Sequence, residues 1–365
     1  MQGRPATHVL LCGVPEYSLT QASKRIRGSE LAPLAPDPLA RNTVETLARW
    51  VTEHRDDLAA PVSTCRLLSG SPASTATLVE FLRAAAEWRD DACTHSEGVA
   101  LLYIAGRCVR PTESDLAILL ADFGDDVGGL LYKSVSLRSL MDGMAPSPWN
   151  PEVPRTQLFF ADLVGPMYES VSDGSGLLSS SWPTPAFDRP TGIAEDDRSA
   201  TFFRAVTPSR SEPADGPASI LGTTLIECLE GAASESAGAE GWAVTSRSLA
   251  SHLPEIFRQR NRELGSSSRL TLEGLTAAGR SVVAKGMTPR RVKYVLGVHS
   301  GDGPQQLVVK DGSLATVLET TIPAHVNSVA VDLFPGLYLM EVREEGQPIQ
   351  NFLAEVGGLG MIAEH

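Results

Sequence analysis

The chain has 365 residues, of which 42% are hydrophobic and 21% are charged. This balance is typical of a globular protein with a full core, and it excludes a disordered chain, a collagen-like repeat and a coiled coil. Lysine and arginine number 31 and aspartate and glutamate number 44, so the formal net charge is −13. Because a protein of this charge repels phosphate backbones and anionic lipid headgroups, we expect neither nucleic acid nor a membrane as a partner.

The cysteines and the absence of known motifs limit which cellular compartment and which cofactors we expect. Five cysteines stand at positions 12, 65, 93, 108 and 228 without a CxxC pair, which indicates neither a disulfide framework nor a zinc site. No apolar run reaches the roughly 20 residues that span a bilayer, and the first residues lack the cleavage site of a signal peptide. We therefore expect a cytoplasmic protein with reduced thiols. The sequence contains no motif for nucleotides, serine hydrolases or zinc proteases, so we expect no cofactor and no metal ion.

Through the first two thirds of the chain, apolar runs alternate with helical patterns. Strands are expected over 8–14, 62–68, 99–105, 157–161 and 201–206. Helices are expected over 39–54, from an N-cap at Ser74 or Thr75 onward, and over 135–144, 220–230 and 246–264, where Pro254 should kink or break the last one. Several of the strands are apolar along their whole length, as in a sheet that is covered on both faces. The pattern predicts an α/β fold with a mostly parallel sheet flanked by helices.

Two later regions do not show this alternation of strands and helices. Residues 167–199 are rich in Ser, Gly, Pro and Asp, and we predict a mobile loop there, which limited proteolysis should cleave first. From residue 289 onward, six short runs of alternating residues are separated by Gly-Asp-Gly, Asp-Gly, Pro-Gly and Glu-Gly turns. That pattern is typical of a small antiparallel β-sandwich. We therefore expect two domains, residues 1–285 and residues 286–365.

Four stretches of the first region carry a resemblance to a known family. They are HVLLCGVPEY (8–17), LAPLAPDPLARNTVETLARWV (31–51), LLYIAGRCV (101–109) and RTQLFFADLVG (155–165). In order and spacing they resemble the caspase-like cysteine peptidases, in particular the bacterial caspase-domain proteins. Later stretches agree with the family's pattern, among them TFFRAVTPSRSEPADG, ILGTTLIECLEGA and GWAVTSRSLASHLPEIF. The resemblance covers roughly residues 6–285 and implies a caspase-like fold for the first domain.

The chain departs from the family at both catalytic positions. Arg107 stands where the family carries its catalytic histidine, and Val164 stands where it carries the nucleophilic cysteine. Valine has no nucleophilic atom, and arginine stays protonated in proteins and cannot act as a general base. The flanking residues Tyr103, Gly106 and Asp162 remain in register with the family's motifs. We therefore predict a pseudo-peptidase without a catalytic residue.

Two neighbouring residues leave alternatives open. Cys108 follows Arg107 directly, and a guanidinium beside it would lower its pKa and make it a substitute nucleophile; an unreactive buried thiol is the competing interpretation. By resemblance, Asp162 stands where an acidic residue recognises a basic side chain of the substrate, so Asp162, Arg107 and Cys108 would line a peptide groove. Alternatively, Asp162 caps a loop or pairs with Arg107 and fills the groove.

The expected function follows from the loss of the catalytic histidine and cysteine, which form the family's catalytic dyad. We expect a scaffold, adaptor or regulator that binds other proteins, and the resemblance implies a multi-protein stress, immunity or conflict system with a protease or an assembly encoded nearby as the partner. One alternative is a cysteine peptidase that uses Cys108 or is activated by cleavage of the 167–199 loop. Another is a peptide receptor built on the vestigial groove at Asp162. The sequence leaves the oligomeric state open.

Overall fold

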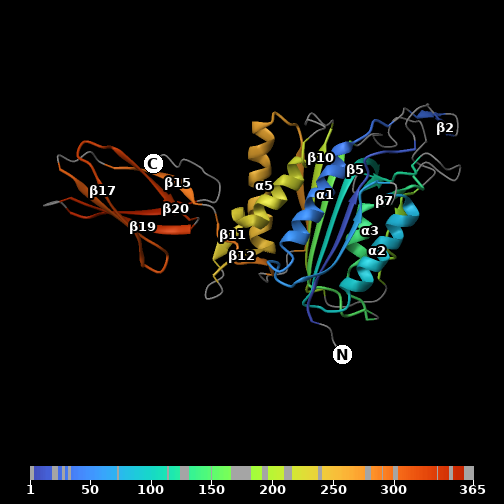
Figure 1. Cartoon of the computed structure of the whole chain (residues 1–365), viewed down its shortest axis with the longest axis horizontal. Coiled ribbons are helices and arrows are strands. Elements are labelled where there is room, and N and C mark those ends of the chain that lie inside the picture. Colours follow the sequence, from blue (N-terminus) through green and yellow to red (C-terminus); the bar gives the residue numbers. More distant parts are fainter. Residues whose placement is uncertain are drawn as a thin grey trace.

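Figure 1 shows the computed structural model of the chain. It describes residues 4–18, 24–26, 29–31, 34–71, 74–112, 115–123, 131–148, 150–165, 182–190, 196–208, 216–236, 241–275, 281–289, 291–298, 303–334, 336–344 and 348–356.

Strands and helices alternate in the first region, as the sequence predicts. In chain order they are β1 (Thr7–Gly13), β2 (Lys24–Ile26), β3 (Ser29–Leu31), α1 (Pro38–Glu53), β4 (Val62–Leu68), α2 (Leu78–Ala92), β5 (Val99–Thr112), β6 (Asp115–Leu119), β7 (Ser134–Ser136), α3 (Leu137–Gly143), β8 (Thr156–Val164), β9 (Thr184–Pro185), β10 (Ser199–Thr207), α4 (Ile220–Glu227), the π-helix η2 (Cys228–Ala232), β11 (Ser234–Ser236), β12 (Trp242–Thr245), α5 (Ser246–Glu263), β13 (Arg269–Leu275) and β14 (Val282–Lys285).

The central sheet is mixed and mostly parallel. Its neighbours run in the order β4, β1, β5, β8, β10 and β13, and every pair is parallel except the last, in which β13 runs antiparallel to β10. β5 is long enough to leave this sheet, and its second half pairs antiparallel with β6, which continues to β7 and β9. The predicted α/β fold with a mostly parallel sheet is confirmed at this level.

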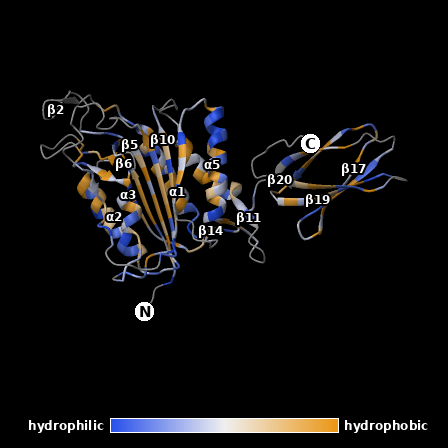
Figure 2. Cartoon of the chain, turned by 180° about the vertical axis from the view of Figure 1, so that it is seen from behind, coloured by the Kyte–Doolittle hydropathy of each residue, from blue (hydrophilic) through white to orange (hydrophobic). Residues whose placement is uncertain are grey.

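Helices cover both faces of the sheet, which explains the continuous apolar runs. On one face Leu10 and Phe159 pack in a cluster with the buried side chains of α2 and α3. On the other face Leu11, Phe160 and Phe203 pack in a cluster with α1, α4 and α5. Successive residues of a strand point to opposite faces, so a strand that is buried on both needs apolar residues throughout. Figure 2 shows the hydrophobic residues gathered on the strands between these helices.

The predicted helices differ from the observed ones at their ends. The side chain of Thr77, and not Ser74 or Thr75, caps α2 by accepting a hydrogen bond from the Glu80 N–H at 3.4 Å. The expected helix over 135–144 begins two residues later, because residues 134–136 pair with β6 as strand β7. Pro254 lies inside α5 and does not break it, because the remaining turns pack their buried face on the sheet and this packing outweighs the lost hydrogen bond.

All six strands predicted after residue 289 are present. They are β15 (Val292–Gly297), β16 (Gln305–Lys310), β17 (Thr316–Ile322), β18 (Ser328–Leu333), β19 (Gly336–Arg343) and β20 (Gln350–Val356). They form two antiparallel sheets, β15–β18 and β17–β16–β19–β20. Side chains from both sheets meet in one hydrophobic cluster that is separate from the two clusters of the first region. In Figure 1 these strands lie beside β11, β12 and α5, away from α2 and α3.

An aromatic contact joins the two regions. The ring of Trp242 in β12 lies 5.9 Å from the ring of Phe334, and the guanidinium carbon of Arg291 lies 4.9 Å from the centre of the Phe334 ring. Gly231 in η2 has φ of 119°, and a side-chain carbon there would come within 2.6 Å of the carbonyl oxygen of Thr288. The chain therefore leaves the first region in close contact with η2.

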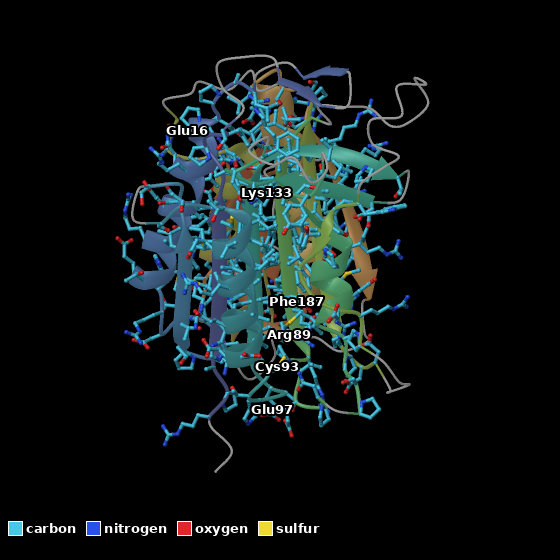
Figure 3. All side chains as sticks on the ribbon, turned by 90° about the vertical axis from the view of Figure 1, so that its right-hand side faces the viewer. Glu16, Arg89, Cys93, Glu97, Lys133 and Phe187 are labelled. Atoms are coloured by element: carbon cyan, nitrogen blue, oxygen red, sulfur yellow. The ribbon has the colours of Figure 1, made fainter. Side chains whose placement is uncertain are left out.

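Most of the predicted loop over 167–199 lies outside the described residues, so its mobility stays a prediction. The described part, residues 182–190, packs against α2 and α3 of the same region. Phe187 is buried, and Arg89 of α2 lies over its ring, with 5.1 Å between the guanidinium carbon and the ring centre (Figure 3). Phe187 also contacts α3 at Gly143, where a side-chain carbon would come within 2.2 Å of it. In the described part of the chain, no helix is long and apolar enough to cross a membrane.

Candidate functional site

The structure brings together the two positions that the resemblance assigns to the catalytic histidine and cysteine. β5 and β8 are adjacent and parallel, and Arg107 is the direct register partner of Val164. Thr207 of β10 is the next partner in the same row. Val164 and Thr207 are the last residues of β8 and β10, and Arg107 is the last residue of β5 that pairs within the central sheet. Parallel α/β sheets bind ligands at this carboxyl edge. The row Arg107, Val164 and Thr207 therefore forms the candidate site, and we call it the edge row.

Buried aromatic rings fix the register beneath the edge row. Tyr103, Phe160 and Phe203 are partners in one row across β5, β8 and β10. The Phe160 and Phe203 rings stack with 4.9 Å between their centres, and the Tyr103 and Phe160 rings lie 6.1 Å apart. A one-residue slip of any strand would turn its ring to the other face of the sheet. The packing of these rings therefore holds Arg107 beside Val164.

Arg107 is held from both its backbone and its side chain. Its N–H donates a hydrogen bond of 2.7 Å to the hydroxyl of Tyr17, and its Nε donates one of 2.8 Å to the carbonyl oxygen of Ala35. Gly106 allows this approach, because a side-chain carbon at Gly106 would come within 3.0 Å of the Tyr17 hydroxyl and 3.1 Å of Val14. The segment between β1 and α1 thus packs onto β5 where this strand leaves the central sheet, and it holds a partly exposed guanidinium there.

Asp162 belongs to a buried polar network two rows below the edge row. It is 3% exposed, and its carboxylate accepts a hydrogen bond of 3.2 Å from the Tyr103 hydroxyl. That hydroxyl also lies 3.3 Å from Oγ of Ser219, the N-cap of α4, and the Ser219 N–H donates to Oγ1 of Thr43 in α1 at 2.9 Å. Buried polar groups are stable only when they are hydrogen-bonded. The burial of Asp162 weighs against its expected role in a peptide groove, and its pairing with Arg107 stays a prediction.

Cys108 does not have the environment of a nucleophile. It follows Arg107 on the opposite face of β5, where it is completely buried among the side chains that pack under α2 and α3. Burial raises the pKa of the Cys108 thiol to about 12, although the Arg110 and Arg204 charges oppose the shift. The expected lowering of its pKa by the neighbouring guanidinium is therefore wrong, because the two side chains point to opposite faces of the strand.

Three of the other thiols share this property. Burial raises the pKa of Cys12, Cys93 and Cys228, and Cys65 lies exposed on β4. Thiolates, not thiols, attack carbonyl carbons. Cys12, Cys93, Cys108 and Cys228 are thus not activated for nucleophilic attack near neutral pH.

The acidic run ADFGDD (121–126) contains three aspartates, a residue type that can bind metal ions. Asp122 accepts hydrogen bonds from the Lys133 ammonium at 2.7 Å and from the Leu78 N–H at the start of α2 at 3.0 Å. Asp125 and Asp126 lie outside the described residues. Among the residues that the structure describes, no group of three His, Cys, Asp or Glu side chains could hold a metal ion.

The sequence interpretation overlooked two residues that shape the site. Tyr17 ends the stretch HVLLCGVPEY and Ser219 lies just before the predicted helix over 220–230, and neither is predicted as a site residue. Their contacts with Arg107 and Tyr103 span 90 and 116 residues of sequence, so no local pattern signals them. The comparisons with known proteins add no relative, because no family model and no curated protein matches the chain.

Proposed function

We propose that this chain is a catalytically inactive caspase-like protein that acts as a scaffold, adaptor or regulator by binding other proteins. Residues 1–285 form the caspase-like domain in this proposal, and residues 286–365 form a β-sandwich that offers a second binding surface. The shared hydrophobic cluster of the two C-terminal sheets supports the sandwich.

One observation carries the proposal. The two positions that the resemblance assigns to the dyad, Arg107 and Val164, are direct partners at the carboxyl edge of adjacent parallel strands. Motifs that are 57 residues apart in sequence would meet in this way if the resemblance is correct. A peptidase needs a thiolate and a proton acceptor there, whereas this edge carries a methyl-bearing side chain and a permanent cation.

The burial of Cys108 supports the proposed absence of peptidase activity. Cys108 is buried on the opposite face of β5, and its pKa is raised to about 12. The relocated-nucleophile alternative requires this thiol to ionise and to reach a substrate, and its burial opposes both. The edge row, by contrast, keeps one partly exposed guanidinium, and guanidinium groups bind carboxylates and backbone carbonyls of proteins.

A direct test is peptide hydrolysis by the full-length chain. We expect no cleavage of a broad peptide library and no labelling of any cysteine by a thiol-reactive peptide probe at neutral pH. Cleavage that Cys108→Ala abolishes would contradict the proposal and establish the relocated nucleophile.

A gain-of-function variant tests the assigned positions. We expect the double variant Arg107→His, Val164→Cys to be labelled at residue 164 by the peptide probe, because an imidazole and a thiol would then be direct register partners. The single variants are the matched controls, and each should react more slowly. Labelling of Val164→Cys that Arg107→His does not accelerate would mean that residues 107 and 164 are not the dyad positions.

A photo-crosslinking side chain tests the binding role. Introduced in place of Arg107, it should capture the same host protein repeatedly, whereas one in place of Val79, which is 68% exposed on α2, should not. Equal capture from both positions would mean that the edge row is not the binding surface.

A further inference from the structure

Residues 182–190 lie on the first region as an added strand does, and we call this segment the strap. Its strand β9 is the last one of the extension β6–β7–β9, and it pairs in parallel with β7 over only two residues, beginning with Thr184 opposite Val135. One residue further on, the Ala186 N–H donates a hydrogen bond of 2.8 Å to Oγ of Ser139. A peptide that adds a strand to the edge of a sheet binds in this way.

One aromatic side chain anchors the strap. Phe187 is 7% exposed, whereas the residues on either side of it are half-buried or exposed. Its ring lies under the guanidinium of Arg89, next to it in Figure 3, and against α3 at Gly143, where a side-chain carbon would come within 2.2 Å of the Phe187 Cβ. The missing side chain of Gly143 therefore makes the socket for this ring. A single aromatic residue in a socket is the usual anchor of a protein–protein contact.

Beside this anchor the strap does not close onto the surface beneath it. A hollow of about 290 Å³ remains, lined by Pro185 and Arg189 of the strap and, opposite them, by Asp115 of β6 and by Arg138 and Asp142 of α3. This volume reaches the lower end of the range found for ligand pockets. The strap therefore occupies the surface of β7 and α3 without filling it.

We propose that the surface of β7 and α3 is a binding site for an extended segment of another protein, and that the strap blocks this site in the free chain. The strap itself shows the chemistry of the partner: a segment that pairs with β7 and carries an aromatic residue three positions later, as Phe187 follows Thr184. The wall opposite the strap holds two carboxylates and one guanidinium, so it favours a basic residue after the aromatic one, as at Arg189. The proposal does not depend on the assignment of the catalytic positions.

The covalent link to the chain decides what a partner must supply. The strap competes at a high effective concentration, because it never leaves the chain. A partner therefore needs contacts that the strap does not make, and the hollow provides room for them. The strap can open while the central sheet stays folded, because its strand has two residues and Phe187 is the one buried residue among residues 182–190.

A fluorescent peptide with the sequence of residues 182–190 tests the site. In Phe187→Ala the strap has lost its anchor and blocks the site less, so fluorescence anisotropy should show that this variant binds the peptide at least about tenfold more tightly than the wild type does. The same peptide with alanine in place of its phenylalanine should not bind. Adding Gly143→Ala to the Phe187→Ala variant should abolish binding, because the new methyl group fills the socket.

Hydrogen exchange of the wild type tests the strap without any substitution. The Ala186 amide should exchange faster than the amides of β8, because the strap opens while the central sheet stays folded. Equal protection of these amides would overturn the proposal. So would loss of the native far-UV circular dichroism spectrum in Phe187→Ala, since Phe187 would then be a core residue. A folded Phe187→Ala variant that binds neither peptide, or both equally, would also overturn it.

Discussion

The two regions of the molecule build their sheets in different ways. Every residue of β8 is buried, because helices cover both faces of the central sheet. In the C-terminal strands buried and exposed residues alternate, as in β18, where Val331 and Leu333 are buried and Asp332 between them is exposed. A strand in the first region therefore fixes its register by packing on both sides, and a strand in the second by packing on one. Substitutions should be most damaging in the first region.

The largest expected loss of stability comes from the centre of the buried row Tyr103, Phe160 and Phe203. Phe160→Ala removes a fully buried ring that contacts both Tyr103 and Phe203, and we expect a loss of about 3–5 kcal/mol in the free energy of unfolding. Urea denaturation followed by tryptophan fluorescence reports this region, because all five tryptophans precede residue 243.

The matched variant in the other region is Phe352→Ala. Phe352 is only partly buried, on the edge strand β20. Urea denaturation followed by far-UV circular dichroism should therefore show a smaller loss in the free energy of unfolding. Equal losses would contradict the view that two-sided packing makes the central sheet the more sensitive one.

An intermediate effect is expected from two tyrosine hydroxyls. Tyr103→Phe removes the hydroxyl that donates to the buried Asp162 carboxylate at 3.2 Å, and a hydrogen bond to a charged group stabilises a protein by about 1.5–3 kcal/mol. Tyr338→Phe removes a hydroxyl that donates to the carbonyl oxygen of Phe334 at 2.8 Å, and Phe334 is a partly exposed residue directly after β18. Urea denaturation of the two variants should therefore show the larger loss for Tyr103→Phe, and the reverse order would contradict the buried network.

The smallest expected effect is a pH dependence confined to the first region. Burial raises the pKa of Cys12, Cys108 and Cys228 above the unfolded value of 9.0. As the pH rises through 9, the unfolded chain releases these protons while the folded chain keeps them, so stability falls. Between pH 8 and pH 9 each thiol should contribute a loss of about 0.3 kcal/mol, or about 1 kcal/mol in all.

The cysteine positions provide the control for this effect. No cysteine follows residue 228, so unfolding of the C-terminal strands should show no contribution from thiols. Cys108→Ala should reduce the loss of stability between pH 8 and pH 9 by about 0.3 kcal/mol. An unchanged slope would mean that the Cys108 thiol ionises as readily in the folded chain as in the unfolded one.

Local pattern predicted the strands well where it was strong. The run at 62–68 and the six C-terminal runs became strands at the expected places, because continuous and alternating apolar residues each have a single way to be buried in a sheet. The helix over 135–144 was less well predicted. Residues 134–136 pair with β6, and a pairing partner distant in sequence leaves no mark in the local pattern.

The chemistry of the edge row can be read from the sequence: position 107 is an arginine and position 164 a valine, so neither residue supplies an imidazole or a thiol, whatever the fold. Tertiary structure alone decided where those residues stand. The register of β5 against β8 places Arg107 beside Val164, and the alternation along β5 turns Cys108 into the core. The type of a side chain determines which chemistry it can do. Its neighbours, its burial and its pKa depend on contacts between residues that are distant in sequence, and a local sequence pattern does not show these contacts.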